Sequence, residues 1–348
     1  MWPCPRIVAE SEEACRKDQG NTIKANEYLD EPEVVLAKVK KIAELIKKAK
    51  FCVAYTGAGL SRSSGIPDYA SKAPNTIIKI KSISTSLNAV PTYAHRVITA
   101  LERSGYVHYY VQQNHDGLPQ KSGFPQEKMN EIHGAWHDPS NPVVKFGGNL
   151  RDDLYDAMMK AEEQTDLCLC LGTSLSGMNA DRMAETPAQK MLKRKALGTI
   201  IINIQRTPLD SISAVRVWAP LDDVFKLLSI ELGLDENLIL NLPNHGTPLP
   251  IQHRHVFKVP YDENGVRSDK KHTMLNLTMG SKVRIAEPEA SNFNVEGYIS
   301  KIKEDGDWVV TLSEKNKIVN RVLGKWWVEA ALKGSIPQLP IINLSHSD

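Results

Sequence analysis

A short apolar run followed by a glycine-rich turn constrains the fold of this chain more than any other feature. The run Phe51–Ala54 is typical of a buried strand, and Gly57 and Gly59 come shortly after it. Glycines permit a tight turn there, and free backbone amides at such a turn favour a phosphate. We therefore expect a nucleotide pocket at the carboxyl end of a parallel strand. Arg62 stands where the ordinary dinucleotide fingerprint has its third glycine, so that fingerprint is not matched.

Strands and helices alternate over most of the chain. Apolar runs at Tyr106–Val111, Leu167–Leu171 and Thr199–Ile204 predict further strands, and helical stretches separate them. This alternation predicts an α/β domain, a Rossmann-like parallel sheet with helices on both faces, because crossover helices cover the faces of a parallel sheet. We expect this domain to span residues 31–240, behind an irregular arm at residues 1–30.

The composition shifts after Leu240. Prolines and a glycine predict a linker over residues 241–272. Residues 273–335 alternate by twos and predict a small antiparallel β-barrel of SH3-like outline, ending at Trp326 and Trp327, with a tail at 336–348. We expect the two tryptophans in the core of this module. An aromatic cage for a methylated lysine is the alternative.

The bulk composition is that of an ordinary globular protein. The net charge is +2 over 348 residues, which is too small to indicate strong attraction to a nucleic acid. No apolar run approaches the ~20 residues that cross a bilayer, and the start of the chain lacks a secretory signal pattern. The five cysteines are scattered, which favours a reducing compartment. We expect an intracellular protein, nuclear or cytoplasmic, with no membrane partner.

Several blocks together resemble one family. The stretch Tyr55–Tyr69 resembles the cofactor motif of the sirtuins, the Sir2 family of NAD-dependent protein deacylases. Further blocks are similar to this family in order and approximate spacing: Gln113–Leu118, Glu131–Gly134, Val144–Gly147, Gly172–Leu175 and Asn203–Gln205. Leu221–Val224 and Glu231–Leu234 are most similar to class IV, which includes the nuclear, chromatin-associated sirtuins. The resemblance covers roughly residues 26–235.

The resemblance implies an enzyme that moves the acyl group of a lysine to ADP-ribose and releases nicotinamide from NAD. An imidazole suits the general base that this reaction needs, and the family motif places His133 there. By the same resemblance Asn114 would orient the ribose and a water, and Asp116 would support the pocket. Two other functions stay open: an NAD hydrolase or ADP-ribosyltransferase, and a non-catalytic adaptor that binds NAD or ADP-ribose.

The resemblance also implies the residues around the ligands. Those expected at the cofactor are Gly57, Ala58, Gly59, Ser61, Ile66, Asp68, Tyr69, Gln113, Asn114, Asp116, Gly172, Thr173, Ser174, Asn203, Gln205 and Leu221. The other substrate would be an acylated-lysine protein or peptide, with histones among the candidates. It would add as a strand between two loops. The residues expected there are Val144, Phe146, Gly147 and Gly177.

Three departures from the family pattern change these expectations. Ala70 stands where the family has an arginine that sets the cofactor loop, so we expect weaker NAD binding, with Lys72 as a substitute charge. Gly148 replaces an acidic residue. The four zinc-binding cysteines of most sirtuins are missing, and a short connection, Ala135–Pro142, fills their place. A structural zinc site needs four ligands, so we expect no metal and a deleted zinc ribbon.

Overall fold

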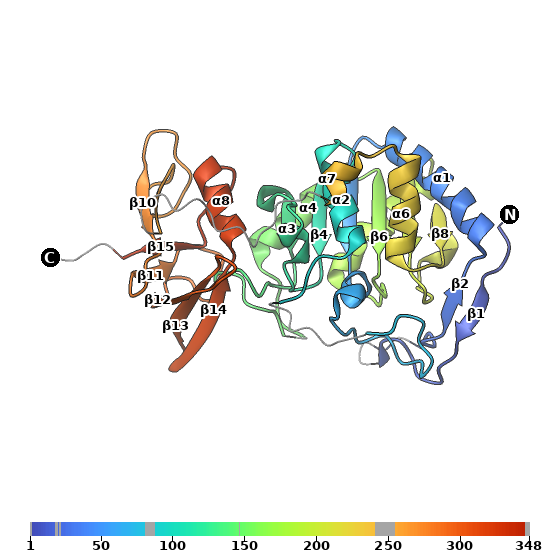
Figure 1. Cartoon of the computed structure of the whole chain (residues 1–348), viewed down its shortest axis with the longest axis horizontal. Coiled ribbons are helices and arrows are strands. Elements are labelled where there is room, and N and C mark those ends of the chain that lie inside the picture. Colours follow the sequence, from blue (N-terminus) through green and yellow to red (C-terminus); the bar gives the residue numbers. More distant parts are fainter. Residues whose placement is uncertain are drawn as a thin grey trace.

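The computed structural model describes residues 2–17, 20, 22–80, 88–145, 147–240 and 255–344. In these residues, the larger domain is built on a six-stranded parallel sheet (Figure 1). Its strands are β3 (Cys52–Thr56), β4 (Tyr109–Gln112), β5 (Met129–Glu131), β6 (Leu167–Leu171), β7 (Gly198–Ile202) and β8 (Val215–Val217). They lie in the order β5-β4-β3-β6-β7-β8. The order reverses between β3 and β6, and ligands of such sheets bind at that reversal, beyond the carboxyl ends of the strands.

Helices cover both faces of this sheet, as predicted. One face carries α1 (Pro32–Lys48), α2 (Tyr93–Arg103), α6 (Leu221–Glu231) and α7 (Glu236–Leu240), which share one apolar core with the strands. The other face carries α4 (Asp152–Gln164) and α5 (Arg182–Leu192), which share a second core. Every residue of β3, β6 and β7 is buried, because both faces of these strands are covered. This burial is why the three strands are continuous apolar runs in the sequence.

The N-terminal arm contains more order than the sequence pattern predicted. Strands β1 (Arg6–Ala9) and β2 (Glu27–Leu29) pair antiparallel, and Ala14 bridges to Lys24 between them. The arm joins the sheet domain where the Tyr28 amide donates to the Ile204 carbonyl oxygen at 2.8 Å. Beside it, the fully buried Glu27 carboxylate accepts bonds from the Thr76 hydroxyl at 2.6 Å and the Ile77 amide at 2.8 Å.

The C-terminal part has its own core, which confirms the predicted separate antiparallel sheet at this end of the chain. Its last strand, Ile341–Asn343, lies in the segment that was predicted to be a tail. Its five-stranded sheet has the order β14-β13-β12-β11-β15, with β14 and β15 at the edges. The strands are β11 (Lys282–Ile285), β12 (Glu296–Ile302), β13 (Trp308–Glu314), β14 (Lys317–Leu323) and β15 (Ile341–Asn343). A hairpin of β9 (Val256–Val259) and β10 (Thr273–Asn276) packs with it, so this core begins at Phe257, inside the predicted linker.

One expected strand of the small domain is a helix. Trp326 and Trp327 lie in α8 (Lys325–Lys333), which ends at Gly334 with a φ of 62°. The sequence Glu329–Gly334 explains the difference: alanines and a leucine favour a helix, and a left-handed glycine ends it. Trp326 is buried and Trp327 packs against the domain core. Trp327 therefore has the core role that we expected, and Trp326 is buried beside His137, so that neither forms an exposed cage.

The small domain contacts the sheet domain at the connection Ala135–Pro142. The Gly324 amide donates to the His137 carbonyl oxygen at 3.0 Å, and the ring centroids of His137 and Trp326 lie 5.1 Å apart. Figure 1 shows α8 and β14 on the side that faces α3 (Leu118–Lys121). The connection that was expected to replace the zinc ribbon is thus covered by the small domain. Among the described residues, no group of three or more histidine, cysteine and acidic side chains could hold a metal ion.

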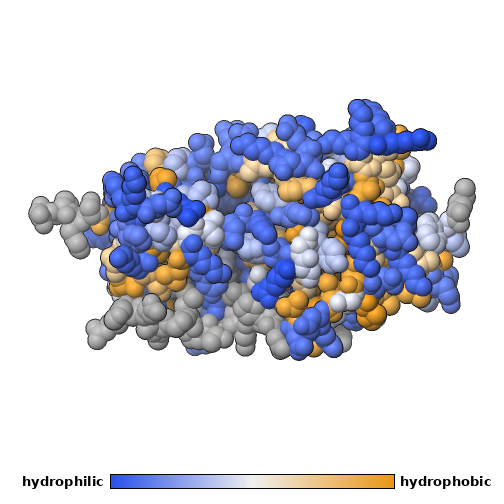
Figure 2. All heavy atoms as spheres, turned by 90° about the horizontal axis from the view of Figure 1, so that it is seen from above, coloured by the Kyte–Doolittle hydropathy of each residue, from blue (hydrophilic) through white to orange (hydrophobic). Residues whose placement is uncertain are grey.

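The surface seen in Figure 2 is mainly hydrophilic, with apolar residues in scattered patches. In the described part of the chain, no helix is long and apolar enough to span a bilayer.

Candidate functional site

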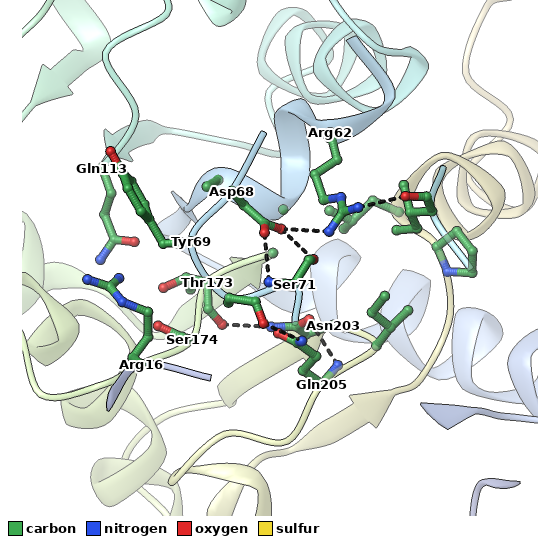
Figure 3. Close-up of a pocket in the computed structure, with 18 of the residues that line it drawn as sticks. Arg16, Arg62, Asp68, Tyr69, Ser71, Gln113, Thr173, Ser174, Asn203 and Gln205 are labelled. Atoms are coloured by element: carbon green, nitrogen blue, oxygen red, sulfur yellow. Dashed lines mark hydrogen bonds and ion pairs between the residues drawn. The ribbon is translucent and has the colours of Figure 1, made fainter. Parts of the chain in front are cut away.

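Two cavities meet at the point where the strand order reverses. The smaller lies beyond the carboxyl ends of β3, β6 and β7 and is drawn in Figure 3. The larger has a volume of about 600 Å³ and contains His133 on its wall. Both cavities share these lining residues: Arg16, Ala58, Tyr69, Gln113, Thr173 and Ser174. A group bound in the smaller cavity can therefore extend directly into the larger one.

The glycine turn after β3 is pressed against the end of β6. An added Cβ on Gly59 would lie 2.8 Å from the Gly172 Cα, and one on Gly57 would lie 2.8 Å from the Thr173 Cα. The Gly57 amide donates to the Leu171 carbonyl oxygen at 3.0 Å, and the Gly59 amide to the Gly172 carbonyl oxygen at 2.8 Å. Of the turn amides that were expected to favour a phosphate, those of Gly57 and Gly59 are therefore not free. They fasten the turn to β6, because buried amides must find acceptors.

The predicted pair Asn114 and Asp116 is held in a network beneath the larger cavity. The buried Asp116 carboxylate accepts bonds from the Ser61 hydroxyl at 2.6 Å and the Leu118 amide at 3.0 Å. Asn114 Nδ2 donates to the Gly57 carbonyl oxygen at 3.0 Å and lies 3.2 Å from Ser61 Oγ. Burial raises the pKa of Asp116 above its usual value. The geometry makes Asp116 a positioning residue that acts through Ser61.

His133 has the electrostatic setting of a neutral imidazole. Burial, with help from the neighbouring His115 and Arg16 charges, lowers its pKa to about 4. Its backbone carbonyl accepts a bond from the Val144 amide at 3.0 Å, which ties it to the loop expected to bind peptide. His115 is fixed beside it by a 2.8 Å bond to the Gly134 carbonyl oxygen. A neutral ring on a cavity wall can accept a proton at physiological pH.

Asp68 is held by a residue that the sequence analysis did not assign. Its carboxylate accepts bonds from the Ser71 amide at 2.8 Å and from Arg62 Nη1 at 3.2 Å. The Arg62 guanidinium also donates to the Ile78 carbonyl oxygen at 2.6 Å, and both charged side chains are buried. Arg62 therefore anchors the cofactor loop that follows Ala70. The signal was present in the sequence, because Arg62 occupies the place of the missing third glycine.

The far wall of the smaller cavity comes from the ends of β6 and β7. Asn203 Nδ2 donates to the Thr173 carbonyl oxygen at 2.8 Å, and Gln205 Nε2 donates to the Ala70 carbonyl oxygen at 2.8 Å (Figure 3). Leu221, at the start of α6, completes this wall. The structure thus brings together the predicted residues of this side. Of the predicted cofactor residues, only Gly57 lies behind the lining of the two cavities.

The expected peptide loops flank the larger cavity. Val144 and Gly147 line it, while Phe146 lies outside the described residues. Gly177 is absent from the lining of the two cavities, although its neighbours Ser176 and Met178 belong to it.

A carboxylate that was not predicted shapes the second of these loops. Asp181 Oδ2 accepts the Gly177 and Met178 amides at 2.9 Å each, and its Oδ1 accepts the Tyr55 hydroxyl at 2.7 Å. Tyr55 lies on β3, so Asp181 ties the loop to the centre of the sheet. The hydrogen bond between Tyr55 and Asp181 joins residues that are 126 positions apart, so no local sequence pattern could predict it.

Comparisons with known proteins agree with this geometry. The Sir2 family model matches residues 69–140. A Bos taurus protein named NAD-dependent protein deacetylase sirtuin-7 is 30% identical in an alignment 285 residues long, which covers 66% of this chain and 70% of that protein. The Arabidopsis thaliana protein named NAD-dependent protein deacetylase SRT1 is 30% identical in an alignment 264 residues long, which covers 62% of this chain and 52% of that protein.

Solved structures with a similar fold include a Sir2 protein with a p53 peptide and NAD⁺. It is 22% identical and has a TM-score of 0.49, with 56% of this chain and 98% of that one covered. An identity of 30% that extends over 70% of the cow protein shows common descent, and the chain therefore belongs to the Sir2 family, the sirtuins.

Proposed function

We propose that this chain is an NAD-dependent protein-lysine deacylase. It would move the acyl group of a modified lysine to ADP-ribose, with release of nicotinamide. The observation that carries this proposal is the shared wall of the two cavities, with the neutral His133 on the larger one. The relatives that match the chain are named as deacetylases that depend on NAD, which supports the same reaction.

The residues of the smaller cavity fit the dinucleotide. Polar side chains of Thr173, Ser174, Asn203 and Gln205 can bond to ribose and phosphate oxygens, and Leu221 offers an apolar contact for the adenine. NAD would supply a ribose carbon that loses nicotinamide and a neighbouring hydroxyl that attacks the acyl group.

The residues of the larger cavity would bind and position the reacting groups. Ile66 lies on its wall, and Asn114 is fixed by its bonds to Gly57 and Ser61. His133 would take the proton from the ribose hydroxyl, because its ring is neutral and faces the cavity. The peptide would lie between the loop at Val144–Gly147 and the loop at Ser176–Met178.

The proposal keeps two locations, the nucleus and the cytoplasm. The similarity of Leu221–Val224 and Glu231–Leu234 to the chromatin-associated class favours the nucleus.

The test is mass spectrometry of the products that the full chain forms from NAD and a panel of acylated-lysine peptides. We expect O-acyl-ADP-ribose and free lysine peptide in equal amounts. His133→Ala should reduce deacylation about a hundredfold or more, since general-base catalysis contributes that much, and should leave NAD binding in place. Plain ADP-ribose without deacylated peptide would identify a hydrolase. Binding of NAD without turnover would identify an adaptor.

A further inference from the structure

We propose that Arg16, on the N-terminal arm, binds the pyrophosphate of the dinucleotide and takes the place of the loop arginine that this chain lacks at Ala70. The proposal rests on the proposed function, because it takes NAD as the ligand of the smaller cavity. It moves an essential cofactor contact outside the region that resembles the family, which begins near residue 26.

The position of Arg16 is the first argument. Its side chain lines both cavities, at the wall that they share. The guanidinium carbon lies 5.7 Å from the centre of the Tyr69 ring, next to the position where the family has its arginine. Figure 3 shows Arg16 on the same side of the pocket as Gln113, Tyr69 and Ser174. A ligand that runs from one cavity into the other must pass this side chain.

The charge balance of the cavity is the second argument. A pyrophosphate carries two negative charges, and anions enter a partly buried site only when cationic or amide donors compensate them. Among the described residues that line the smaller cavity, the positively charged side chains are Arg16 and Arg62. Arg62 is buried and holds Asp68 and the Ile78 carbonyl oxygen. Arg16, which contacts the Tyr69 ring, lies on the wall that the two cavities share. The amides of Gly57 and Gly59, which a phosphate would otherwise use, donate to β6.

The packing of the arm is the third argument. Cys15, next to Arg16, is 1% exposed, and its amide donates to the Ile23 carbonyl oxygen at 2.9 Å. Ala25 is fully buried, and Glu27 bonds to the cofactor loop at Thr76. The backbone next to Arg16 is therefore anchored at Cys15, so that little backbone freedom would be lost there on binding.

The experiment compares ligands with and without phosphates. Calorimetry on the full chain would measure the Kd of ADP-ribose, NAD and adenosine for the wild type and for Arg16→Ala. We expect ADP-ribose and NAD to bind about tenfold to hundredfold more weakly to the variant, as for loss of one charged hydrogen bond. Adenosine should bind equally well to both. Arg6→Ala is the matched control: Arg6 lies on the same arm, its side chain is 65% exposed, and it pairs with Glu31 at the start of α1.

A second variant links Arg16 to the missing arginine. Ala70→Arg should change the affinity of the wild type for ADP-ribose little, but should restore most of the affinity that Arg16→Ala loses. Arg16→Lys, which keeps the charge, should lie between the wild type and Arg16→Ala, and it provides the test if the alanine variant fails to fold. Equal loss of adenosine and ADP-ribose, or no loss of either, would overturn the role of Arg16. A wild-type chain that binds none of the three ligands would instead overturn the proposed function.

Discussion

At the scale of single residues, the site is controlled by how burial sets protonation. His133 has a pKa of about 4, so it is neutral at about pH 6.5, where an ordinary histidine would be half protonated. Besides His133, the charged and titratable residues that line the larger cavity are Arg16, Tyr69, His115, Asp116, Lys145 and Asp181. The positive charge of Arg16 opposes a proton on His133.

This protonation predicts the pH dependence of the reaction. The kcat/KM for peptide should stay level between about pH 8 and 5.5, since His133 remains in its base form there. Arg16→Ala should raise the pKa of His133 and move the acidic decline upward, because a repelling charge is gone. Rates at saturating and subsaturating peptide over this range would check both points. A midpoint near 6.5 in the wild type would show that His133 is not the base or is not shielded.

The buried Glu131 predicts that the stability of the folded chain decreases as the pH rises, whereas the reaction rate decreases as the pH falls. Burial, with a contribution from Asp138, raises its pKa to about 8, above the ordinary value near 4.3. Between these two pKa values the folded chain holds a proton that the unfolded chain releases, so stability falls as the pH rises from about 4.3 to about 8 and is level above that. Glu131→Gln should gain in Tm relative to the wild type between about pH 5 and 8. Glu163→Gln, at an exposed position, should show no such gain. Parallel Tm curves for wild type and Glu131→Gln would contradict the raised pKa.

At the scale of elements, the contact between the glycine turn and β6 fixes the cofactor cavity. Gly172 has a φ of +60°, and an added Cβ would lie 2.6 Å from the Leu60 amide nitrogen, a backbone atom that cannot turn aside. Gly105 has a φ of +77° with no atom within 4 Å. Both glycines thus have a left-handed backbone conformation, but only at Gly172 would an added Cβ clash with a neighbouring backbone atom.

Substitution by alanine should separate the two effects. Gly105→Ala should cost roughly 1 kcal/mol of stability from backbone strain alone. Gly172→Ala should cost roughly 1–3 kcal/mol more, since overpacking adds to it, and should weaken NAD binding. Urea unfolding with calorimetry would measure both. Equal losses of stability at the two positions would mean that the turn can move away from β6.

The elements that could be predicted from the sequence are those whose pattern follows their burial. β3, β6 and β7 are buried on both faces and appear as continuous apolar runs. β14 was not predicted, because it is an edge strand with mostly exposed or half-buried residues. The order in the arm was also missed, since Glu27 and Tyr28 are held by Thr76 and Ile204, far along the chain.

Some residues of the candidate site could likewise be predicted from the sequence and others could not. Residues that lie on motifs after strands, such as Asn114, His133 and Asn203, are brought to one edge of the sheet as predicted. The supporting residues Arg16, Arg62 and Asp181 were not assigned, because their partners are fixed by tertiary contacts and not by local sequence.

At the scale of the whole molecule, the small domain covers the connection that leads from His133. His137 lies between α8 and the sheet domain, with its ring 1% exposed. Burial and the nearby Lys121 and Lys303 lower its pKa to about 3, against the attraction of Asp305. Its ring is therefore neutral, and the 3.7 Å approach of its Nε2 to Asp307 is a packing contact and not an ion pair.

Acid should therefore weaken the contact between the domains. The unfolded or separated state takes up a proton at His137 below about pH 6.5, and the docked state resists it down to about pH 3, so stability falls as the pH drops through this window. His137→Phe keeps a ring against Trp326 and removes the titration. Its Tm should fall less than that of the wild type between pH 7 and 5. An equal fall for both proteins would show that other groups, such as the buried His95, account for the acid sensitivity.

The path of the chain around the cofactor cavity has a practical consequence. A recombinant fragment chosen by motif would start near residue 26 or 31 and would keep every recognisable block from Tyr55 to Leu234. It would lose Arg16 and, with the later start, the Glu27 carboxylate that holds Thr76 and Ile77. Such a fragment would look complete in sequence and yet would bind the dinucleotide more weakly than the full chain. A protease that removes the segment carrying Arg16 would weaken the site in the same way without cutting any of its motifs.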